Sequence, residues 1–277
     1  MDIRVIAFDL DGTFLDDGKH IPPENLAALE AAAARGCLIV PATGRIYVGI
    51  PEALRSLPFM RWYITANGSY LYDAVEDRAV ARAEIAPRRA VEFLRFADTL
   101  PVLYDCYQDN FGYISRGFLD RVPEFVTDPG ILRLVRELRT PVEELKAYLL
   151  EKGEGVQKLQ LYFRDMELRR RMLRELPGQW PDLSFSTSVP FNIEINSSAA
   201  TKGQALCTLC RLLDIDVGAA LTLGDGTNDM DLITRAGTGV AMGNADPELK
   251  AAAAWVTGDN NHGGFADAVR RFALGEG

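Results

Sequence analysis

The hydrophobic positions at the start of the chain form short unbroken runs separated by longer helical patterns. The run Ile3–Phe8 is mainly apolar and is typical of a strand buried on both faces. A helix is expected over residues 22–36, because proline favours a helix start and glycine a helix end. Further strands are expected at Leu38–Val40 and near Trp62–Thr65. Apolar strands joined by helices predict a Rossmann-like parallel sheet with helices on both faces, an α/β fold.

From about residue 81 to residue 190 the pattern changes to alternating apolar and polar positions. The segments VLYDCYQ, GYISR and VQKLQLYFR alternate in this way, and RRAVEFLRFADTL and PVEELKAYLLEKG are typical of helices. This pattern predicts an α+β domain with an antiparallel sheet and helices on one face. The last part, beginning with AALTLGDGTNDMDLITRAG, returns to strand followed by helix. We therefore expect a core domain formed by residues 1–80 and 191–277, with residues 81–190 inserted as a separate domain.

Composition and charge narrow the classes of partner. The chain has 277 residues and a net charge of −9, and no stretch combines many lysines or arginines with aromatic residues. Nucleic acid and membrane surfaces are therefore not expected partners. Asp2 and Arg4 interrupt any leader-like start, and no apolar run is long enough for a bilayer, so a cytoplasmic location is expected. The sequence leaves the oligomeric state open.

Two acidic clusters follow apolar strands that are far apart in the sequence. Asp9 and Asp11 follow the first strand, where Gly12 lets the chain turn, and Asp225 and Asp229 follow the strand Leu221–Leu223. Strand ends of one parallel sheet meet at the same edge, where ligands bind near a switch in strand order. Two carboxylates about 4 Å apart repel by roughly 4 kcal/mol at an effective dielectric constant near 20. A cation is therefore expected between the clusters.

The ligand types select the cation. Oxygen ligands favour magnesium or calcium, and the chain has only two histidines. Neither DLDGTF nor DGTNDM fits the calcium-loop pattern, so magnesium is preferred. Cys207 and Cys210 form a C-x-x-C without a second pair, and we interpret them as part of a buried helix face instead of a zinc or redox site.

Two further segments carry groups that suit an anionic substrate. The segment ATGR places the Thr43 hydroxyl, the Gly44 amide and Arg45 at the end of the second strand. Lys202 begins a helix, where a cation is unfavourable unless an anion binds nearby. GDGTND lacks the third glycine of a dinucleotide fingerprint, so a dinucleotide is not expected.

Together, these motifs resemble those of the haloacid dehalogenase superfamily of phosphatases. D-x-D-G-T, A-T-G-R, a distant lysine and G-D-x-x-N-D occur in that order. The phrases GDGTNDMDLI, GVAMGNA and VTGDNNHGG are similar to those of the Cof-type subfamily. The resemblance implies that the inserted domain is an α/β cap of type IIB, which closes over the site and excludes water.

The resemblance also implies a role for each motif residue. Asp9 would be the nucleophile that forms an aspartyl-phosphate, and Asp11 the acid and then the base. The implied phosphate-binding residues are Thr43, Gly44, Lys202 and Asn228. The implied magnesium ligands are Asp9, Asp225 and the backbone carbonyl of Asp11. The supporting residues are Asp229, Arg45 and Gly12.

The expected function is a magnesium-dependent phosphatase that acts on a small phosphorylated metabolite, with a sugar phosphate as the expected class. A phosphotransferase or mutase on sugar phosphates is the alternative among enzymes. A non-catalytic sensor of magnesium and a phosphorylated ligand is the alternative among binding proteins, although pure binding does not need Asp11.

Three other positions lie close to the motifs. Asn67 in ANGS fits a tight turn and a substrate contact equally well. Asp16 and Asp17 are interpreted as a solvated loop, and Glu194 is placed where the chain returns to the core domain, without a role.

Overall fold

The structure is a computed structural model that describes residues 2–276, and these form two compact units. The first, called the core domain, comprises Met1–Arg45, Ile50–Arg82 and Thr201–Gly277. The second, called the inserted domain, comprises Ile46–Gly49 and Ala83–Ala200. No helix within residues 2–276 combines the length and the apolar character that a membrane crossing requires.

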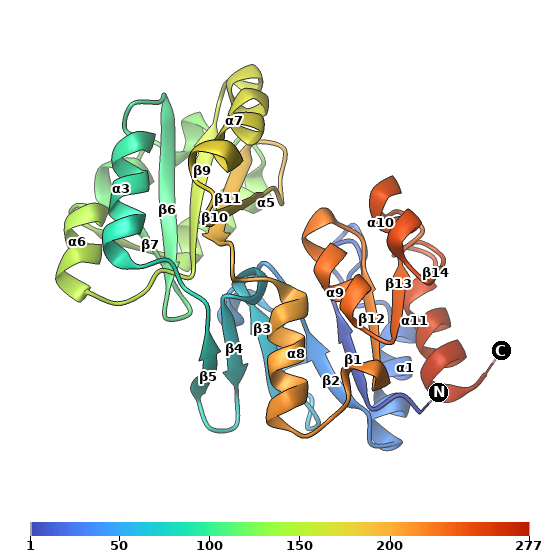
Figure 1. The fold of residues 1–277 in the computed structure, drawn as a ribbon. Coiled ribbons are helices and arrows are strands. Elements are labelled where there is room, and N and C mark those ends of the chain that lie inside the picture. Colours follow the sequence, from blue (N-terminus) through green and yellow to red (C-terminus); the bar gives the residue numbers. More distant parts are fainter. Residues whose placement is uncertain (1, 277) are drawn as a thin grey trace. The chain divides into compact units, whose positions relative to one another are not determined.

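The core domain contains the parallel sheet that the strand pattern predicts (Figure 1). Its strand order is β14-β13-β12-β1-β2, and every neighbouring pair is parallel. The strands are β1 (Val5–Phe8), β2 (Leu38–Pro41), β12 (Ala220–Gly224), β13 (Thr238–Ala241) and β14 (Trp255–Val256). The chain crosses from β1 to β2 on one side and reaches β12 and β13 on the other. The order therefore switches between β1 and β12.

Helices cover both faces of this sheet, which confirms the predicted α/β class (Figure 1). They are α1 (Pro23–Ala34), α2 (Glu52–Arg55), α8 (Lys202–Leu212), α9 (Met230–Arg235), α10 (Pro247–Ala252) and α11 (Gly264–Val269). Val5 and Ala7 pack with α8 and α9 on one face. On the other face, Phe8 packs edge-on against Phe265 of α11, with ring centroids 5.0 Å apart. Alternate residues of β1 thus pack against different helical layers.

The strand expected near Trp62–Thr65 forms, but it does not extend the parallel sheet as a full strand. It is β3 (Trp62–Thr65), and it pairs antiparallel with β4 (Tyr70–Asp73), which pairs with β5 (Arg78–Arg82). An isolated parallel bridge between Ala42 and Ile64 joins β3 to the residue after β2.

The inserted domain contains a six-stranded sheet of order β10-β11-β9-β6-β7-β8, in which only the β7–β8 pair is parallel. Its strands are β6 (Val102–Gln108), β7 (Phe111–Ser115), β8 (Arg139–Val142), β9 (Lys158–Phe163), β10 (Leu183–Ser186) and β11 (Asn192–Ser197). Its helices are α3 (Pro87–Ala97), α4 (Arg116–Leu119), α5 (Pro129–Leu138), α6 (Leu145–Lys152) and α7 (Met166–Gln179).

Helices lie on both faces of this second sheet, although the sequence predicted them on one. Residues of α3, α6 and α7 pack against Tyr104 and Leu161 in the larger apolar cluster. Leu103 and Tyr162, which alternate with these positions, pack instead against Val126 and α5 in a smaller cluster. The smaller cluster covers part of the second face.

The inserted domain ends after Ala200, so the boundary expected at residue 190 is wrong. β11 pairs with β9 on one side and with β10 on the other. Its alternate residues Ile193 and Ile195 are fully buried in the apolar cluster of the inserted domain. Glu194 therefore lies within the inserted domain, and the chain returns to the core domain only after Ala200.

Candidate active site

The predicted site residues of the core domain lie beyond the carboxyl ends of its central strands. Asp9 follows β1, and its backbone amide donates to the carbonyl of Leu223 in β12 (3.0 Å). Asp225 follows β12, and Ala42 after β2 donates to the carbonyl of Phe8 (2.7 Å). The site therefore occupies the switch in strand order, where open parallel sheets bind ligands.

Lys202 is a buried cation that contacts two acids of this site. It is the first residue of α8 and is fully buried, and its Nζ donates to Asp9 Oδ1 (2.7 Å) and Asp229 Oδ1 (2.6 Å). The two carboxylates explain how a lysine is tolerated at a helix N-terminus, where the helix dipole opposes it. Burial lowers the pKa of Lys202, but the carboxylates of Asp229 and Asp9 more than offset this effect and raise it above its ordinary value.

Three carboxylates meet around this lysine. Oxygen atoms of Asp9, Asp225 and Asp229 lie within 4.8 Å of one another. Burial, together with the neighbouring carboxylates of Asp229, Asp225 and Asp11, raises the pKa of Asp9 well above its ordinary value despite the opposing effect of Lys202. Burial and the carboxylate of Asp229 raise the pKa of Asp225 to about 6. One lysine does not neutralise three acids.

This donor set fits a magnesium ion. The carboxylates of Asp9 and Asp225 supply the hard oxygen ligands that magnesium prefers, and Asp225 is only partly buried, so water can complete the coordination. Burial and the neighbouring carboxylates raise the pKa values of Asp9 and Asp225, and a divalent cation would favour their ionised forms. The residues present therefore suit the ion that the sequence predicts.

Both carboxylate oxygens of Asp229 accept hydrogen bonds from neighbouring residues. It is fully buried, and its Oδ2 accepts from the backbone amides of Asp225 and Gly226 (3.1 Å each) while its Oδ1 accepts from Lys202. A Cβ at Gly224 would lie 2.5 Å from the Cβ of Asp229, so glycine is needed there. Asp229 thus fixes both Lys202 and the loop that carries Asp225.

The carboxylate of Asp11 points to two cations instead of the acidic cluster. Arg45 donates to both oxygens of Asp11 from Nε and Nη2 (2.7 Å each), and Lys19 Nζ lies 2.8 Å from Oδ1. Burial would raise the pKa of Asp11, but Arg45 and Lys19 outweigh burial and hold it below its ordinary value. The two cations therefore favour the ionised form of Asp11.

The turn after Asp11 is shaped for a close approach to Asp225. Gly12 has a φ of +78°, and a Cβ there would lie 2.3 Å from Asp225 Oδ2. Thr13 is fully buried, and its Oγ1 donates to Asp225 Oδ1 (2.8 Å). The motif predicted a supporting role for Gly12 but none for Thr13, because a contact between residues so far apart in the sequence has no local signal.

The ATGR segment lies at the end of β2. Thr43 is buried, and its Oγ1 accepts from the backbone amide of Arg45 (3.2 Å). Its own amide donates to Ile64 of β3 (2.8 Å). Gly44, between Thr43 and Arg45, is partly exposed. The segment reaches Asp11 through Arg45, so the second motif adjoins the first.

Asn67 lies in a tight turn, which is one of the two roles that the sequence left open for it. Its φ of +59° places it in a tight turn between β3 and β4, and its Oδ1 accepts from Asn228 Nδ2 (3.2 Å). The turn also approaches α8, because a Cβ at Gly68 would lie 2.2 Å from the carbonyl of Thr201. Asn67 therefore positions Asn228, one of the predicted phosphate-binding residues.

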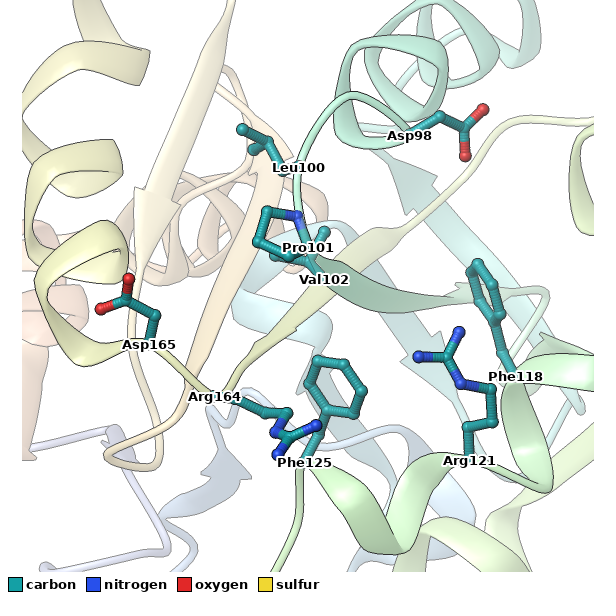
Figure 2. A pocket seen from close by; sticks show the side chains of 9 residues that line it. All are labelled: Asp98, Leu100, Pro101, Val102, Phe118, Arg121, Phe125, Arg164 and Asp165. Atoms are coloured by element: carbon teal, nitrogen blue, oxygen red, sulfur yellow. The ribbon is translucent and has the colours of Figure 1, made fainter.

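The inserted domain has a surface cavity of about 570 Å³ of its own (Figure 2). It is lined by Asp98, Leu100, Pro101, Val102, Phe118, Arg121, Phe125, Arg164 and Asp165. None of these is a predicted site residue. The cavity lies at the Val102 end of β6.

Comparison with known proteins decides the family. The model of the haloacid dehalogenase-like hydrolases matches residues 6–269. The chain belongs to this family. The match spans both domains, which confirms the resemblance carried by the motifs, including its Cof type.

Relatives that match this chain over nearly its whole length are phosphatases. A 5-amino-6-(5-phospho-D-ribitylamino)uracil phosphatase from Bacillus subtilis, YcsE, is 29% identical over 99% of this chain and 97% of its own. The pyridoxal phosphate phosphatase YbhA of Escherichia coli is 26% identical over 98% of each chain. The family and these relatives identify the chain as a phosphatase.

Solved structures agree on the fold. A haloacid dehalogenase-like hydrolase from B. subtilis has a TM-score of 0.79 at 28% identity and covers 98% of this chain and 100% of its own. The subclass IIB sugar phosphatase BT4131 has a TM-score of 0.81 at 21% identity, with 98% of this chain and 99% of that chain covered. The α/β core with an inserted α+β domain is therefore shared.

Proposed function

We propose that this phosphatase hydrolyses a small phosphorylated metabolite, with a sugar phosphate as the substrate class, through an aspartyl-phosphate on Asp9 and with magnesium. The observation that carries the proposal is the contact of Lys202 Nζ with Asp9 Oδ1 inside a cluster of three acids. A carboxylate can approach a phosphate dianion only where positive charge compensates the repulsion.

The first half of the reaction needs a nucleophile and an acid. An oxygen of the Asp9 carboxylate attacks phosphorus, and the bond from phosphorus to the ester oxygen breaks. That oxygen takes a proton from Asp11 and leaves as an alcohol. Since Arg45 holds Asp11 in the ionised form, it must release the carboxyl group before Asp11 can act as the acid.

The second half returns the enzyme to its starting state. Asp11, now a carboxylate, takes a proton from water, and the water oxygen attacks phosphorus. The bond between phosphorus and Asp9 then breaks, and inorganic phosphate leaves. Thr43, Gly44, Lys202 and Asn228 are the proposed donors to the phosphoryl oxygens. Splitting one difficult displacement into two makes each easier.

Magnesium would be held by Asp9, Asp225 and the backbone carbonyl of Asp11. When bound, it supplies positive charge that offsets the repulsion between these carboxylates and a phosphate dianion. Asp229 would act one layer further out, because its two oxygens already accept hydrogen bonds from Lys202 and from the loop amides.

The substrate class rests on the relatives. Their names specify phosphoesters of small molecules: a phosphoribitylamino-uracil for YcsE and pyridoxal phosphate for YbhA. These names support a small metabolite, and the ribityl phosphate supports a sugar-like group. The cytoplasmic location expected from the sequence stays a prediction.

The proposal is tested with Asp9→Asn, which keeps the size of the side chain and removes the nucleophile. Turnover of an aryl phosphate with magnesium should be abolished while the circular dichroism spectrum is unchanged. Asp120→Asn makes the same change at an exposed residue of the inserted domain and should retain activity. Substantial activity in Asp9→Asn would refute the nucleophile.

Transfer to an acceptor is the alternative to hydrolysis. Added sugars should leave the release of inorganic phosphate unchanged. A fall in phosphate release together with a phosphorylated sugar would identify a phosphotransferase instead.

A further inference from the structure

Three asparagine side chains hold the loop that follows the two catalytic acids. This loop, residues 12–17, is called the catalytic loop. Asn244 Nδ2 donates to the carbonyl of Gly12 (2.8 Å). Asn25 Nδ2 donates to the carbonyl of Phe14 (3.0 Å), and Asn260 Nδ2 to that of Leu15 (3.0 Å). The three asparagines come from segments that are far apart in the sequence.

The loop needs these donors because of its own backbone geometry. The amides of Thr13, Phe14 and Leu15 all point to one acceptor, the carbonyl of Leu10, at 3.4, 3.1 and 2.9 Å. This arrangement makes a tight turn but leaves loop carbonyls to be satisfied from outside. Buried backbone carbonyls without a partner are costly, so external donors determine where the loop lies.

Asn260 is the central member of this set. It is 2% exposed, and its Nδ2 also lies 3.1 Å from Asp17 Oδ1. Its backbone amide donates to Asn244 Oδ1 (3.2 Å), which aims the Asn244 side chain at Gly12. Asn260 therefore secures both ends of the catalytic loop. It belongs to GDNNHGG and Asn244 to GVAMGNA, two phrases that have no role in the proposed reaction.

The catalytic loop controls two groups of the site. Asp11 directly precedes the loop, and Thr13 within it donates to Asp225 Oδ1. A displacement of the loop would move the acid–base relative to the nucleophile and loosen Asp225. Phe14 remains packed between Phe8 and Phe265 in any case, with ring centroids 5.0 and 4.9 Å away. Loss of Asn260 should therefore shift the loop locally and leave the core folded.

We propose that Asn260 is a positioning residue for the phosphatase reaction, acting through the catalytic loop and not by contact with substrate. Part of this inference rests on the proposed function, namely the role of Asp11. The other part, that Asn260 immobilises residues 12–17, does not depend on any activity.

Asn261 offers a matched control. It is exposed, exchanges two hydrogen bonds of 3.1 Å with Asp17, and donates from Nδ2 to Asn260 Oδ1 at the longer distance of 3.5 Å. Among the described residues, its hydrogen bonds do not include one to a carbonyl of residues 12–15. Asn260→Ala and Asn261→Ala thus make the same chemical change in adjacent residues. Only the first removes the donor to Leu15.

Kinetics form the first test. In Asn260→Ala, kcat for an aryl phosphate with saturating magnesium should fall by about 10²-fold, the usual effect of misplacing a catalytic group by about 1 Å. KM should change little, because Thr43 and Lys202 lie outside the loop. Asn261→Ala should keep the wild-type kcat. Equal kcat values in the two variants, measured well below their melting temperatures, would overturn the proposal.

Hydrogen exchange forms the second test and needs no activity. The amides of Thr13, Phe14 and Leu15 should exchange faster in Asn260→Ala than in the wild type and in Asn261→Ala. Unchanged exchange there would overturn the proposal even if the chain hydrolysed no phosphate. If Asn260→Ala does not fold, the exposed Asn244→Ala replaces it, with faster exchange at Thr13 supporting and unchanged exchange refuting the positioning of the loop.

Discussion

Replacement of Lys202 by methionine should destabilise the core domain strongly, because the lysine compensates two buried acids. Its side chain is fully buried between Asp9 and Asp229. Removing one partner of such a buried pair usually costs about 3–5 kcal/mol, since the remaining charge has no partner. At about 2–4 °C per kcal/mol for a domain of this size, the melting temperature should fall by roughly 6–20 °C.

Thermal unfolding without magnesium measures this effect, and a second substitution tests its cause. Asp229→Asn in the Lys202→Met background removes one of the uncompensated charges and should recover part of the lost stability. Lys152→Met is the control, because Lys152 is about half exposed and forms a loose ion pair with Glu154, with Nζ 3.8 Å from Oε2. A surface pair contributes about 0–1 kcal/mol.

Two results would refute the reasoning on Lys202. One is a melting temperature of Lys202→Met equal to that of the wild type, which would mean that the acids are compensated in another way. The other is a further loss of stability when Asp229→Asn is added, which would mean that charge is not the cause.

Two more predictions concern other ion pairs. Burial would raise the pKa of Asp73, but Arg61 and two backbone amides lower it, so the folded state favours the carboxylate. Asp73→Asn should reduce the melting temperature near pH 7, and this difference should shrink as the pH falls below about 4, the ordinary pKa of an aspartate, and vanish below the lowered pKa of Asp73. A difference that persists in acid would contradict the ion pair as its source. In the inserted domain, Arg139→Met should cost about 3–5 kcal/mol in denaturant unfolding, because Asp105 Oδ2 loses the 2.6 Å contact with Arg139 Nε while buried. A cost below that of a surface variant would show that Tyr162, which also donates to Asp105, suffices.

The convergence of Asp9 and Asp225 could be predicted from the sequence because it depends only on topology. Each follows an apolar strand, and the ends of parallel strands meet at one edge. Figure 1 shows β1 and β12 as neighbours in the sheet. The same argument placed Thr43 after β2. Lys202 was expected at the site, but its contact with Asp9 depends on where α8 begins relative to β1.

Contacts between loops could not be predicted in this way. The pairing of Arg45 with Asp11 depends on side-chain conformation, and the donors Asn244 and Asn260 reach the catalytic loop from more than 200 positions away. The predicted end of the inserted domain differed from the observed one for a related reason. In the segment FNIEINS apolar and polar residues alternate, and this pattern would suit an edge strand of either domain. Its pairing with β9 and β10, which are distant in the sequence, assigns it to the inserted domain.

Isolation of the phosphorylated intermediate tests the central claim most directly. In Asp11→Asn the group that activates water is missing, so the aspartyl-phosphate should accumulate when a reactive aryl phosphate and magnesium are added. After acid quenching and digestion, mass spectrometry should find one phosphoryl group on the peptide that contains Asp9. Two results would contradict Asp9 as the nucleophile. One is the absence of a phosphoryl group in a sample that shows an initial burst of released aryl alcohol, and the other is a phosphoryl group on any other residue.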